Sequence, residues 1–236
     1  MARTKAWLSW SSGKDSAWAL RELRASGDVE VAGLLTVVTE TFGRVSMHGV
    51  RTSVLEAQAR AAGIPLVTVP IPFPCSNEEY AARMSAAMQR ALAEGVLAVA
   101  FGDLYLEDVR RYRERNLEPI GIRALFPLWG MPTRELANRM IEGGLEAIVS
   151  CLDPAKVPRE LAGRRYDRGF LAALPPDVDP CAENGEFHTV AVAGPMFSHP
   201  LGVRVGETVE RDGFVFTDVL LNGEEVLPGG AQPTRG

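Results

Sequence analysis

The sequence predicts an α/β fold in which a five-stranded parallel sheet carries helices on both faces and a smaller α+β region follows. Apolar, β-branched segments alternate with helical patterns five times between residue 5 and about residue 151. These apolar segments contain few polar residues, as is typical of parallel strands buried on both faces. From Leu152 onwards, prolines interrupt the alternation. We therefore expect one domain over residues 1–151 and a second region over residues 152–227.

Strands and helices of the first domain are separated by turn-forming residues. The expected strands are residues 6–10, 29–38, 66–69, 96–101 and 145–151, and all are assigned to the parallel sheet. Helices are expected to begin near residues 16, 52, 76, 104 and 133. Gly27, Gly63 and Gly95 end the first three, because glycine adopts the left-handed conformation that closes a helix. Ser76 and Glu79 have the spacing of a capping box.

Two of these helices carry side-chain patterns that bear on function. In the third helix, apolar side chains recur at helical spacing, and we interpret this stripe as core rather than as a ligand surface. The stripe consists of Tyr80, Met84, Met88 and Ala91. In the fourth helix, arginines alternate with acidic residues, which predicts a solvated face with ion pairs rather than a nucleic-acid patch. The arginines are Arg110, Arg111, Arg113 and Arg115.

The second region is expected to mix short elements. A short helix is predicted near residues 170–174 and a strand at residues 190–193. Arg211, Asp212 and Gly213 precede an apolar segment and predict the turn of a β-hairpin. The Pro/Gly-rich residues 228–236 are expected to form a flexible tail.

The loop after the first strand reads Ser-Ser-Gly-Lys-Asp-Ser at residues 11–16. Ser11, Ser12 and Gly13 carry small side chains or none, so their backbone N–H groups can surround an anion. The start of the following helix points its dipole and free amides at the same place. Lys14 adds a positive charge and Ser16 a hydroxyl. We interpret the loop as a phosphate-binding site, the alternative being a serine-rich turn that caps a helix.

Composition and charge exclude several classes of protein. The net charge of −5 gives no basic footprint, so nucleic acid is not an expected partner. No apolar run approaches membrane-spanning length, so a membrane is not expected either. The three cysteines are far apart in the sequence and include no Cys-x-x-Cys pair, which favours a reducing, cytoplasmic location.

A second polar cluster lies near the end of the chain and comprises Glu183, Asn184, Glu186 and His188. In an extended segment Glu186 and His188 would face one side while Phe187 packs on the other. Two carboxylates, an amide and an imidazole could hold an amine and remove its proton. The alternative interpretation is a polar turn that leads into a strand.

These segments together resemble a known family. Residues 11–16 look like the Ser-Gly-Gly-x-Asp-Ser signature of the PP-loop ATP pyrophosphatases, with Ser12 in place of the first glycine. With residues 102–104 and 181–189, the chain resembles the bacterial-type branch of the diphthine–ammonia ligase family over roughly residues 5–192. The resemblance implies a Rossmann-like (HUP-type) sheet, as in the adenine nucleotide alpha hydrolase-like superfamily. It also implies an ATP-binding first domain and a substrate-binding second region.

The resemblance further implies an AMP-forming C–N ligase that uses ATP and Mg²⁺. A substrate carboxylate would attack the α-phosphate of ATP, and ammonia would then displace AMP. The residues expected to hold the phosphates are Ser11, Ser12, Gly13, Lys14, Asp15, Ser16, Gly102 and Asp103. Asp15 and Asp103 are candidate Mg²⁺ ligands, although each could instead cap a helix.

Ammonia and the carboxylate substrate are expected to meet the C-terminal cluster. Glu183 and Glu186 would bind and activate ammonia, Asn184 would orient the substrate, and His188 would act as base or as carboxylate anchor. His48 could line the adenine or substrate pocket, the alternative being a solvated loop histidine. The family's last motif has glycine and glutamate where this chain has Asn184 and His188, so a substrate other than diphthine, either a small molecule or a protein, is expected.

Two other functions stay open at this point. One is a PP-loop enzyme that modifies tRNA, for example by thiolation, or a metabolite, although the acidic pI near 5.4 disfavours tRNA as the substrate. A non-catalytic ATP sensor would have no need for the polar cluster at residues 183–188. A homodimer is also left open.

Overall fold

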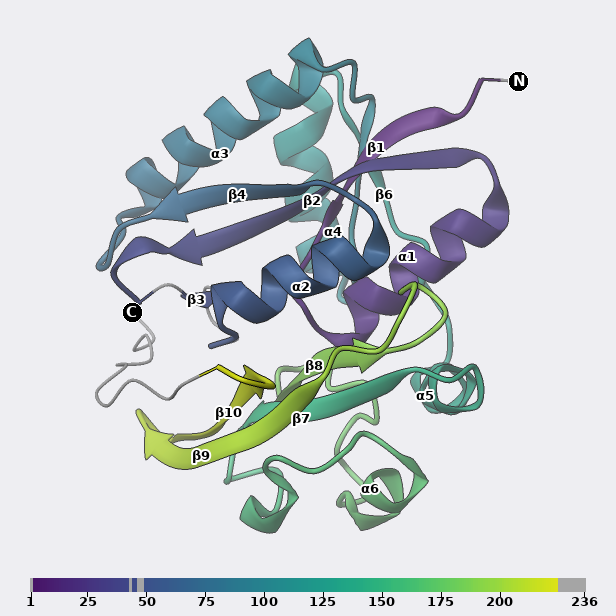
Figure 1. The fold of residues 1–236 in the computed structure, drawn as a ribbon. Coiled ribbons are helices and arrows are strands. Elements are labelled where there is room, and N and C mark those ends of the chain that lie inside the picture. Colours follow the sequence, from purple (N-terminus) through teal and green to yellow (C-terminus); the bar gives the residue numbers. More distant parts are fainter. Residues whose placement is uncertain (1, 43, 46–48, 225–236) are drawn as a thin grey trace.

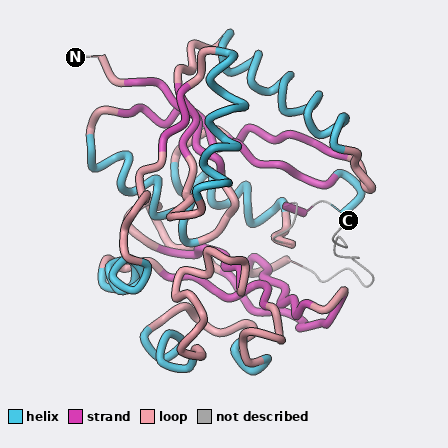
Figure 2. Tube along the Cα trace, turned by 180° about the vertical axis from the view of Figure 1, so that it is seen from behind, coloured by secondary structure: helices cyan, strands magenta, loops and turns pink. Residues whose placement is uncertain are grey.

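Two β-sheets lie one above the other, with helices between them (Figure 1). The computed structural model describes residues 2–42, 44–45 and 49–224. The predicted tail at residues 228–236 therefore lies outside the described residues. Figure 2 gives the same arrangement from behind, with strands of both sheets separated by helical segments.

The first sheet confirms the predicted five-stranded parallel arrangement. Its parallel strands pair in the order β4-β2-β1-β5-β6. A short antiparallel strand, β3, joins β2 at one end. The bounds are β1 Thr4–Ser9, β2 Val29–Thr39, β3 Arg44–Val45, β4 Leu66–Ile71, β5 Ala98–Ala100 and β6 Arg123–Leu125. β1 lies between β2, the next strand along the chain, and β5, which follows β4. The strand order therefore reverses at β1, and such sheets bind ligands at the carboxyl end of the strands at this point.

The predicted fifth parallel strand, residues 145–151, is placed wrongly in the first sheet. This segment is β7 (Glu146–Leu152), and it pairs antiparallel with β8 and β10 in the second sheet. The fifth parallel strand is instead β6, whose residues Arg123–Leu125 form a three-residue edge strand. A segment this short carries no periodic apolar pattern, so the sequence gives no signal for it.

Helices cover both faces of the first sheet. α3 and α4 pack on the face that carries Trp7, and α1 and α2 pack on the face that carries Leu8. This division follows from β1 itself, because successive side chains of a strand point to opposite faces. The bounds are α1 Lys14–Ser26, α2 Thr52–Ala62, α3 Asn77–Ala93, α4 Glu107–Leu117 and α5 Thr133–Glu142. Gly27 and Gly63 end α1 and α2 in the left-handed conformation, as predicted.

The second sheet is antiparallel and packs against the outer side of α1 and α2. Its strands pair in the order β8-β7-β10-β9, and the further elements are β8 Phe187–Ala193, β9 Val203–Arg211, β10 Phe214–Leu221 and α6 Arg168–Ala173. The predicted hairpin is confirmed, with Asp212 and Gly213 at φ +50° and +78° between β9 and β10. Three short 3₁₀ helices, Glu40–Phe42, Glu118–Ile120 and Arg159–Leu161, complete the fold.

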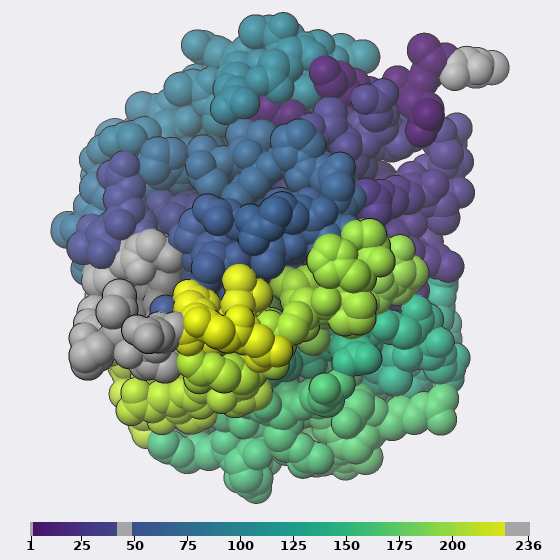
Figure 3. Space-filling view, in the orientation of Figure 1, coloured from purple at the N-terminus to yellow at the C-terminus, as the bar shows by residue number. Residues whose placement is uncertain are grey.

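The main hydrophobic core is shared by the two sheets. Side chains from β1, α1, α2, β7 and β8 belong to one buried cluster, among them Leu8, Trp18, Leu55, Val149 and Phe187. α1 contacts β8, and α2 contacts β10. In the space-filling view, the blue atoms of the first domain lie directly against the green and yellow atoms of the C-terminal region (Figure 3). No helix within the described residues is long and apolar enough to cross a bilayer.

Gln58 of α2 ties the loop after β1 to the second sheet. Its side chain is fully buried. Its Oε1 accepts hydrogen bonds from the Trp10 indole at 2.9 Å and the Ser12 hydroxyl at 2.8 Å. Its Nε2 donates to the carbonyls of Ser12 and Ala191 at 3.0 and 2.7 Å. All the hydrogen-bonding capacity of this amide is therefore used inside the protein.

Gln58→Leu is expected to lower the free energy of unfolding by roughly 3 kcal/mol, because buried polar groups of Trp10, Ser12 and Ala191 lose their partner. Urea unfolding followed by circular dichroism measures the change. Gln89→Leu, at an exposed position of α3, is the matched control and should shift stability by less than about 0.5 kcal/mol. Equal effects of both variants would contradict this role of Gln58.

Candidate functional site

The loop predicted to bind phosphate connects β1 to α1 at the reversal point of the first sheet. Ser12 adopts φ +72°, a left-handed conformation that favours glycine, at the position where the sequence departs from the glycine of the PP-loop signature. The Ser11 hydroxyl accepts from the Gly13 amide at 3.4 Å and lies 3.2 Å from the Ser16 hydroxyl. The segment is therefore a loop between β1 and α1, as predicted, and contacts among Ser11, Gly13 and Ser16 stabilise it.

Lys14 is buried, with 2% of its surface exposed. Its ammonium donates to the Asp15 carboxylate at 2.9 Å and to the Cys181 carbonyl at 2.5 Å. The rings of Phe187 and Tyr166 lie 5.3 and 5.6 Å from Nζ. The Lys14 charge thus joins the loop after β1 to Cys181, which is 167 residues away in sequence and immediately precedes the segment with the C-terminal cluster.

Gly102 and Asp103 follow β5 and lie beside the start of α1. A Cβ at Gly102 would stand 3.0 Å from the Asp15 carbonyl carbon and 3.1 Å from the Ser16 amide nitrogen, so any other residue would require the start of α1 to shift by a few tenths of an ångström. The interpretation of Asp103 as the cap of the next helix is wrong, because α4 begins at Glu107 after Leu106. The Asp103 carboxylate instead accepts from Arg113 Nε at 3.4 Å.

Asp179 shapes the segment that carries the C-terminal cluster. Its two carboxylate oxygens accept from the amides of Cys181 and Glu183, each at 3.0 Å. The turn places Ala182 at φ +57°. Glu183 then reaches back to the first domain, where its Oε1 accepts from the Leu104 amide at 2.7 Å and the Tyr105 amide at 3.4 Å. This carboxylate therefore fixes the backbone that follows Gly102 and Asp103.

Glu186 and Asn184 form the inner part of the cluster. Glu186 is 4% exposed, and its Oε1 accepts from the Asn184 amide at 3.1 Å. Asn184 also donates to the Tyr105 hydroxyl at 3.0 Å. The other oxygen, Glu186 Oε2, is buried without a hydrogen-bond partner, as is Asp15 Oδ1. A buried carboxylate oxygen of this kind has capacity for a donor that the protein does not supply.

The two candidate histidines have different outcomes. His188 is half-buried on β8 and pairs with Cys151 of β7, while its neighbour Phe187 packs into the core against Phe170, with ring centroids 5.0 Å apart. Phe187 is predicted to pack on the side opposite to Glu186 and His188, and its burial in the core is consistent with this. His48 lies outside the described residues.

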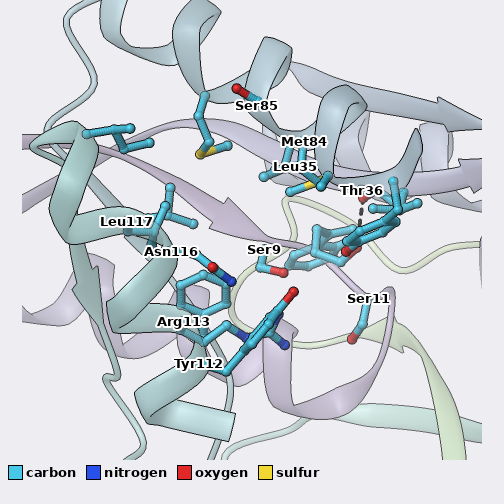
Figure 4. A pocket seen from close by; sticks show the side chains of 18 residues that line it. Ser9, Ser11, Leu35, Thr36, Met84, Ser85, Tyr112, Arg113, Asn116 and Leu117 are labelled. Atoms are coloured by element: carbon cyan, nitrogen blue, oxygen red, sulfur yellow. Dashed lines mark hydrogen bonds between the residues drawn. The ribbon is translucent and has the colours of Figure 1, made fainter. Parts of the chain in front are cut away.

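A pocket of about 440 Å³ opens beside the phosphate loop, between the first sheet, α3 and α4 (Figure 4). Ser9 at the end of β1 and Ser11 in the loop line it, and Leu35 and Met84 form part of its apolar wall. The interpretation of the α3 stripe as core alone is wrong. Met88 and Ala91 are core residues, but Tyr80, Met84 and Met88 also line the pocket.

Burial perturbs the titration of the acidic groups of the site. Burial raises the pKa of Asp15, although the Lys14 ammonium opposes this. Burial lowers the pKa of Lys14, but the charge and hydrogen bond of Asp15, together with the nearby Cys181 and Asp179, outweigh burial, and the pKa is raised. Burial also raises the pKa of Glu183 to about 7, against the two backbone hydrogen bonds that it accepts. Carboxyls with raised pKa values gather at functional sites.

Several residues that build the site were not singled out from the sequence. They are Gln58, Tyr105, Asp179 and Tyr166, whose hydroxyl donates to the Pro180 carbonyl at 2.8 Å. Thr189 also belongs here, because its hydroxyl accepts from the Lys14 amide at 3.1 Å. Asp179 alone carries a local signal, since aspartate before proline is typical of turns. The others act through partners that are distant in sequence. Arg113 is expected from the sequence only as part of a solvated face, whereas it lines the pocket and pairs with Asp103.

Comparison with protein families gives two matches that follow one another along the chain. The model described as the diphthamide synthase N-terminal domain matches residues 4–124. The model described as the diphthamide synthase C-terminal domain matches residues 132–219. A comparison with individually curated proteins gave no match.

Glu183 should make stability fall as the pH rises. Its pKa is about 7 in the folded protein and 4.5 when unperturbed, so the folded state holds the extra proton between these values. Stability is therefore lost between about pH 4.5 and 7 and is constant above that range. Glu183→Gln keeps an oxygen acceptor for Leu104 and Tyr105 but cannot titrate.

The measurement is the difference in urea midpoint between wild type and Glu183→Gln from pH 5 to 8. The urea midpoint of the wild type should fall relative to that of the variant as the pH rises across this range. Glu207→Gln, an exposed position of β9, serves as the matched control and should give a flat difference. A flat difference for Glu183→Gln as well would refute the assignment.

Proposed function

Because this chain belongs to the diphthamide synthase family, whose two domain models match residues 4–124 and 132–219, we propose that it is an ATP-dependent, AMP-forming amide ligase. A substrate carboxylate attacks the α-phosphate of ATP, and pyrophosphate leaves. Ammonia then attacks the resulting acyl-adenylate, and AMP leaves with both electrons of the broken C–O bond. The proton lost by the nitrogen passes to a base in the site.

One observation carries this proposal. The Lys14 ammonium donates to the Asp15 carboxylate in the phosphate loop at 2.9 Å and to the carbonyl of Cys181, two residues before the C-terminal cluster, at 2.5 Å. An adenylating ligase needs its nucleotide-binding loop and its amine-binding groups at one place, because both steps occur at the same substrate carboxyl carbon. A sensor or a kinase needs no such second reactive cluster.

The residues around the pocket fit an adenine nucleotide. Its apolar wall, with Leu35, Met84 and Phe101, suits a purine base, and its volume of about 440 Å³ lies in the range of small-ligand sites. The close contact of Gly102 with the start of α1 keeps the turn that carries Asp103 beside the phosphate loop. Ser11, Ser12, Gly13 and Ser16 would hold the β- and γ-phosphates there.

Lys14 would stabilise the negative charge that grows on the leaving pyrophosphate. Asp15 and Asp103 would hold Mg²⁺, which supplies further positive charge at the phosphates. No group of three His, Cys, Asp or Glu side chains in the described ranges could hold a metal by itself. Mg²⁺ sites at nucleotides commonly use one or two carboxylates with the phosphates as remaining ligands, so this pair suits such a site.

Glu186 is the proposed ammonia-binding and base residue. Its Oε2 is buried without a partner, so it can accept a hydrogen bond from ammonium and take the proton released on attack. Asn184 holds the other oxygen of Glu186 and would orient the carboxylate substrate with His188. For Glu183 the contacts with Leu104 and Tyr105 support a positioning role toward Asp103.

The proposal predicts AMP and pyrophosphate, formed from ATP, Mg²⁺, ammonium and a pool of cellular carboxylates. Lys14→Ala should lower kcat by about 10²-fold or more, since it removes charge stabilisation in the transition state. Glu186→Gln should lower the ammonium-dependent rate by about 10²-fold, the usual size of a lost base. Chromatography of the nucleotides distinguishes AMP from ADP.

Two variants control for non-specific damage. Lys5→Ala removes a lysine that donates only to the Glu94 carbonyl at the surface, and Glu207→Gln replaces an exposed glutamate. Both should keep wild-type rates. ADP as the product, or tight ATP binding without any cleavage, would contradict the ligase proposal and favour a kinase-like or sensor role. AMP formation without ammonium dependence would contradict the assignment of ammonia.

A further inference from the structure

Arg113 is the only charged side chain among the described residues that line the pocket of about 440 Å³. It comes from α4, which also contributes Asn116 and Leu117 to the lining, three and four positions further along the same helix face. Figure 4 shows Arg113 on the lower side of the pocket, beside Tyr112 and across from Ser11. A guanidinium in an otherwise uncharged pocket calls for an anionic partner.

In the structure that partner is Asp103. Arg113 Nε donates to Asp103 Oδ2 at 3.4 Å, which is long for a charge-assisted hydrogen bond. The guanidinium lies over the Phe101 ring, 4.7 Å from its centroid. The ring holds the guanidinium plane in place, while the single long contact leaves most of its five N–H donors available.

The neighbouring arginines of α4 are engaged elsewhere. Arg110 pairs with Glu114 at 2.9 Å and lies over the Trp129 ring at 4.8 Å. Arg111 pairs with Glu107 and Asp108 on the exposed side of the helix. Arg113 alone of these three lies between the pocket and a carboxylate at the end of the parallel sheet.

We propose that Arg113 binds a phosphate oxygen of the nucleotide and exchanges Asp103 for it. In the structure Asp103 and Arg113 neutralise each other at the edge of the pocket. A phosphate offers the guanidinium two oxygens in its own plane, a better match than the single contact with Asp103. The exchange leaves the Asp103 carboxylate without its arginine and so available to a cation that accompanies the phosphates.

This inference rests on the proposed function in one respect, that the pocket takes ATP. It adds a phosphate-binding residue from α4, outside the loop at residues 11–16, and a reason for the ion pair at the pocket edge. A purely structural Arg113–Asp103 pair would affect all ligands of the pocket alike. An anion-binding Arg113 affects only ligands that carry phosphate.

The test is calorimetric binding of ATP and of adenosine in EDTA, with wild type, Arg113→Gln and Arg111→Gln. Arg113→Gln should weaken ATP by about tenfold to a hundredfold, the loss expected for charged hydrogen bonds, and adenosine by less than about twofold. Arg111→Gln, the matched control on the same helix, should leave both affinities unchanged.

Asp103→Asn tests the exchange itself. Without a competing carboxylate, Arg113 is free before the ligand arrives, so this variant should bind ATP about threefold to tenfold more tightly than wild type in EDTA. Weaker or equal ATP binding by Asp103→Asn would overturn the exchange. Equal losses of ATP and adenosine in Arg113→Gln, or no loss of either, would overturn the phosphate contact.

Failure of the inference is distinguishable from failure of the proposed function. If wild type binds ATP and Arg113→Gln binds it equally well, the role of Arg113 is refuted while the ligase proposal stands. If wild type binds neither ATP nor adenosine, both are refuted. Thermal unfolding of each variant in the absence of ligand identifies any that has lost its fold, and Arg113→Lys, which keeps the charge, should then recover part of the ATP affinity.

Discussion

The buried ammonium of Lys14 is the contact on which the rest of this site depends. A buried charge needs partners, and Lys14 takes one from the adjacent Asp15 and one from the Cys181 carbonyl, with the rings of Tyr166 and Phe187 around it. If the loop after β1 and the turn before β8 separated, the Lys14 ammonium would either become exposed to water or stay buried without its Cys181 partner. Under the proposed function, phosphate and amine would therefore bind at one place.

The phosphate loop reaches the second sheet because α1 and α2 pack between the two sheets. Each of these helices is covered by the first sheet on one side and contacts the second sheet on the other, so the start of α1 lies deep in the molecule. Gln58 and Thr189 extend the same link, since both bond to the loop that begins α1. Glu183 adds a third connection by accepting from the backbone after β5. A site fixed at so many points is rigid, which is what the proposed reaction would need to align a carboxylate, a phosphate and an amine.

Local signals in the sequence predicted local structure well. The order of β1, phosphate loop and α1, the glycines that end α1 and α2, and the hairpin at Asp212 and Gly213 all depend on neighbouring residues. Sheet membership does not. A buried apolar strand looks the same in either sheet, which is why residues 145–151 were assigned to the wrong one, and β6 is too short for any pattern. The interpretation of the α3 stripe as core alone was wrong for a related reason, because helical spacing identifies an inward face but not whether that face meets a packed core or a cavity.

The contacts of Arg113 with Asp103 and of Glu183 with Leu104 could not be predicted from the sequence, since these partners are brought together by tertiary packing. Ser12 is instructive in the other direction, because it replaces a glycine of the PP-loop signature and adopts a left-handed backbone conformation.

Hydrogen exchange of backbone amides in wild type and Lys14→Met tests the central claim most directly. If the Lys14 charge joins the two parts of the site, its loss should speed exchange at residues 179–189 as well as at residues 11–16, while α3 exchanges as in wild type. Faster exchange at residues 11–16 alone, with residues 179–189 unchanged, would contradict the account and make Lys14 a residue of the phosphate loop only.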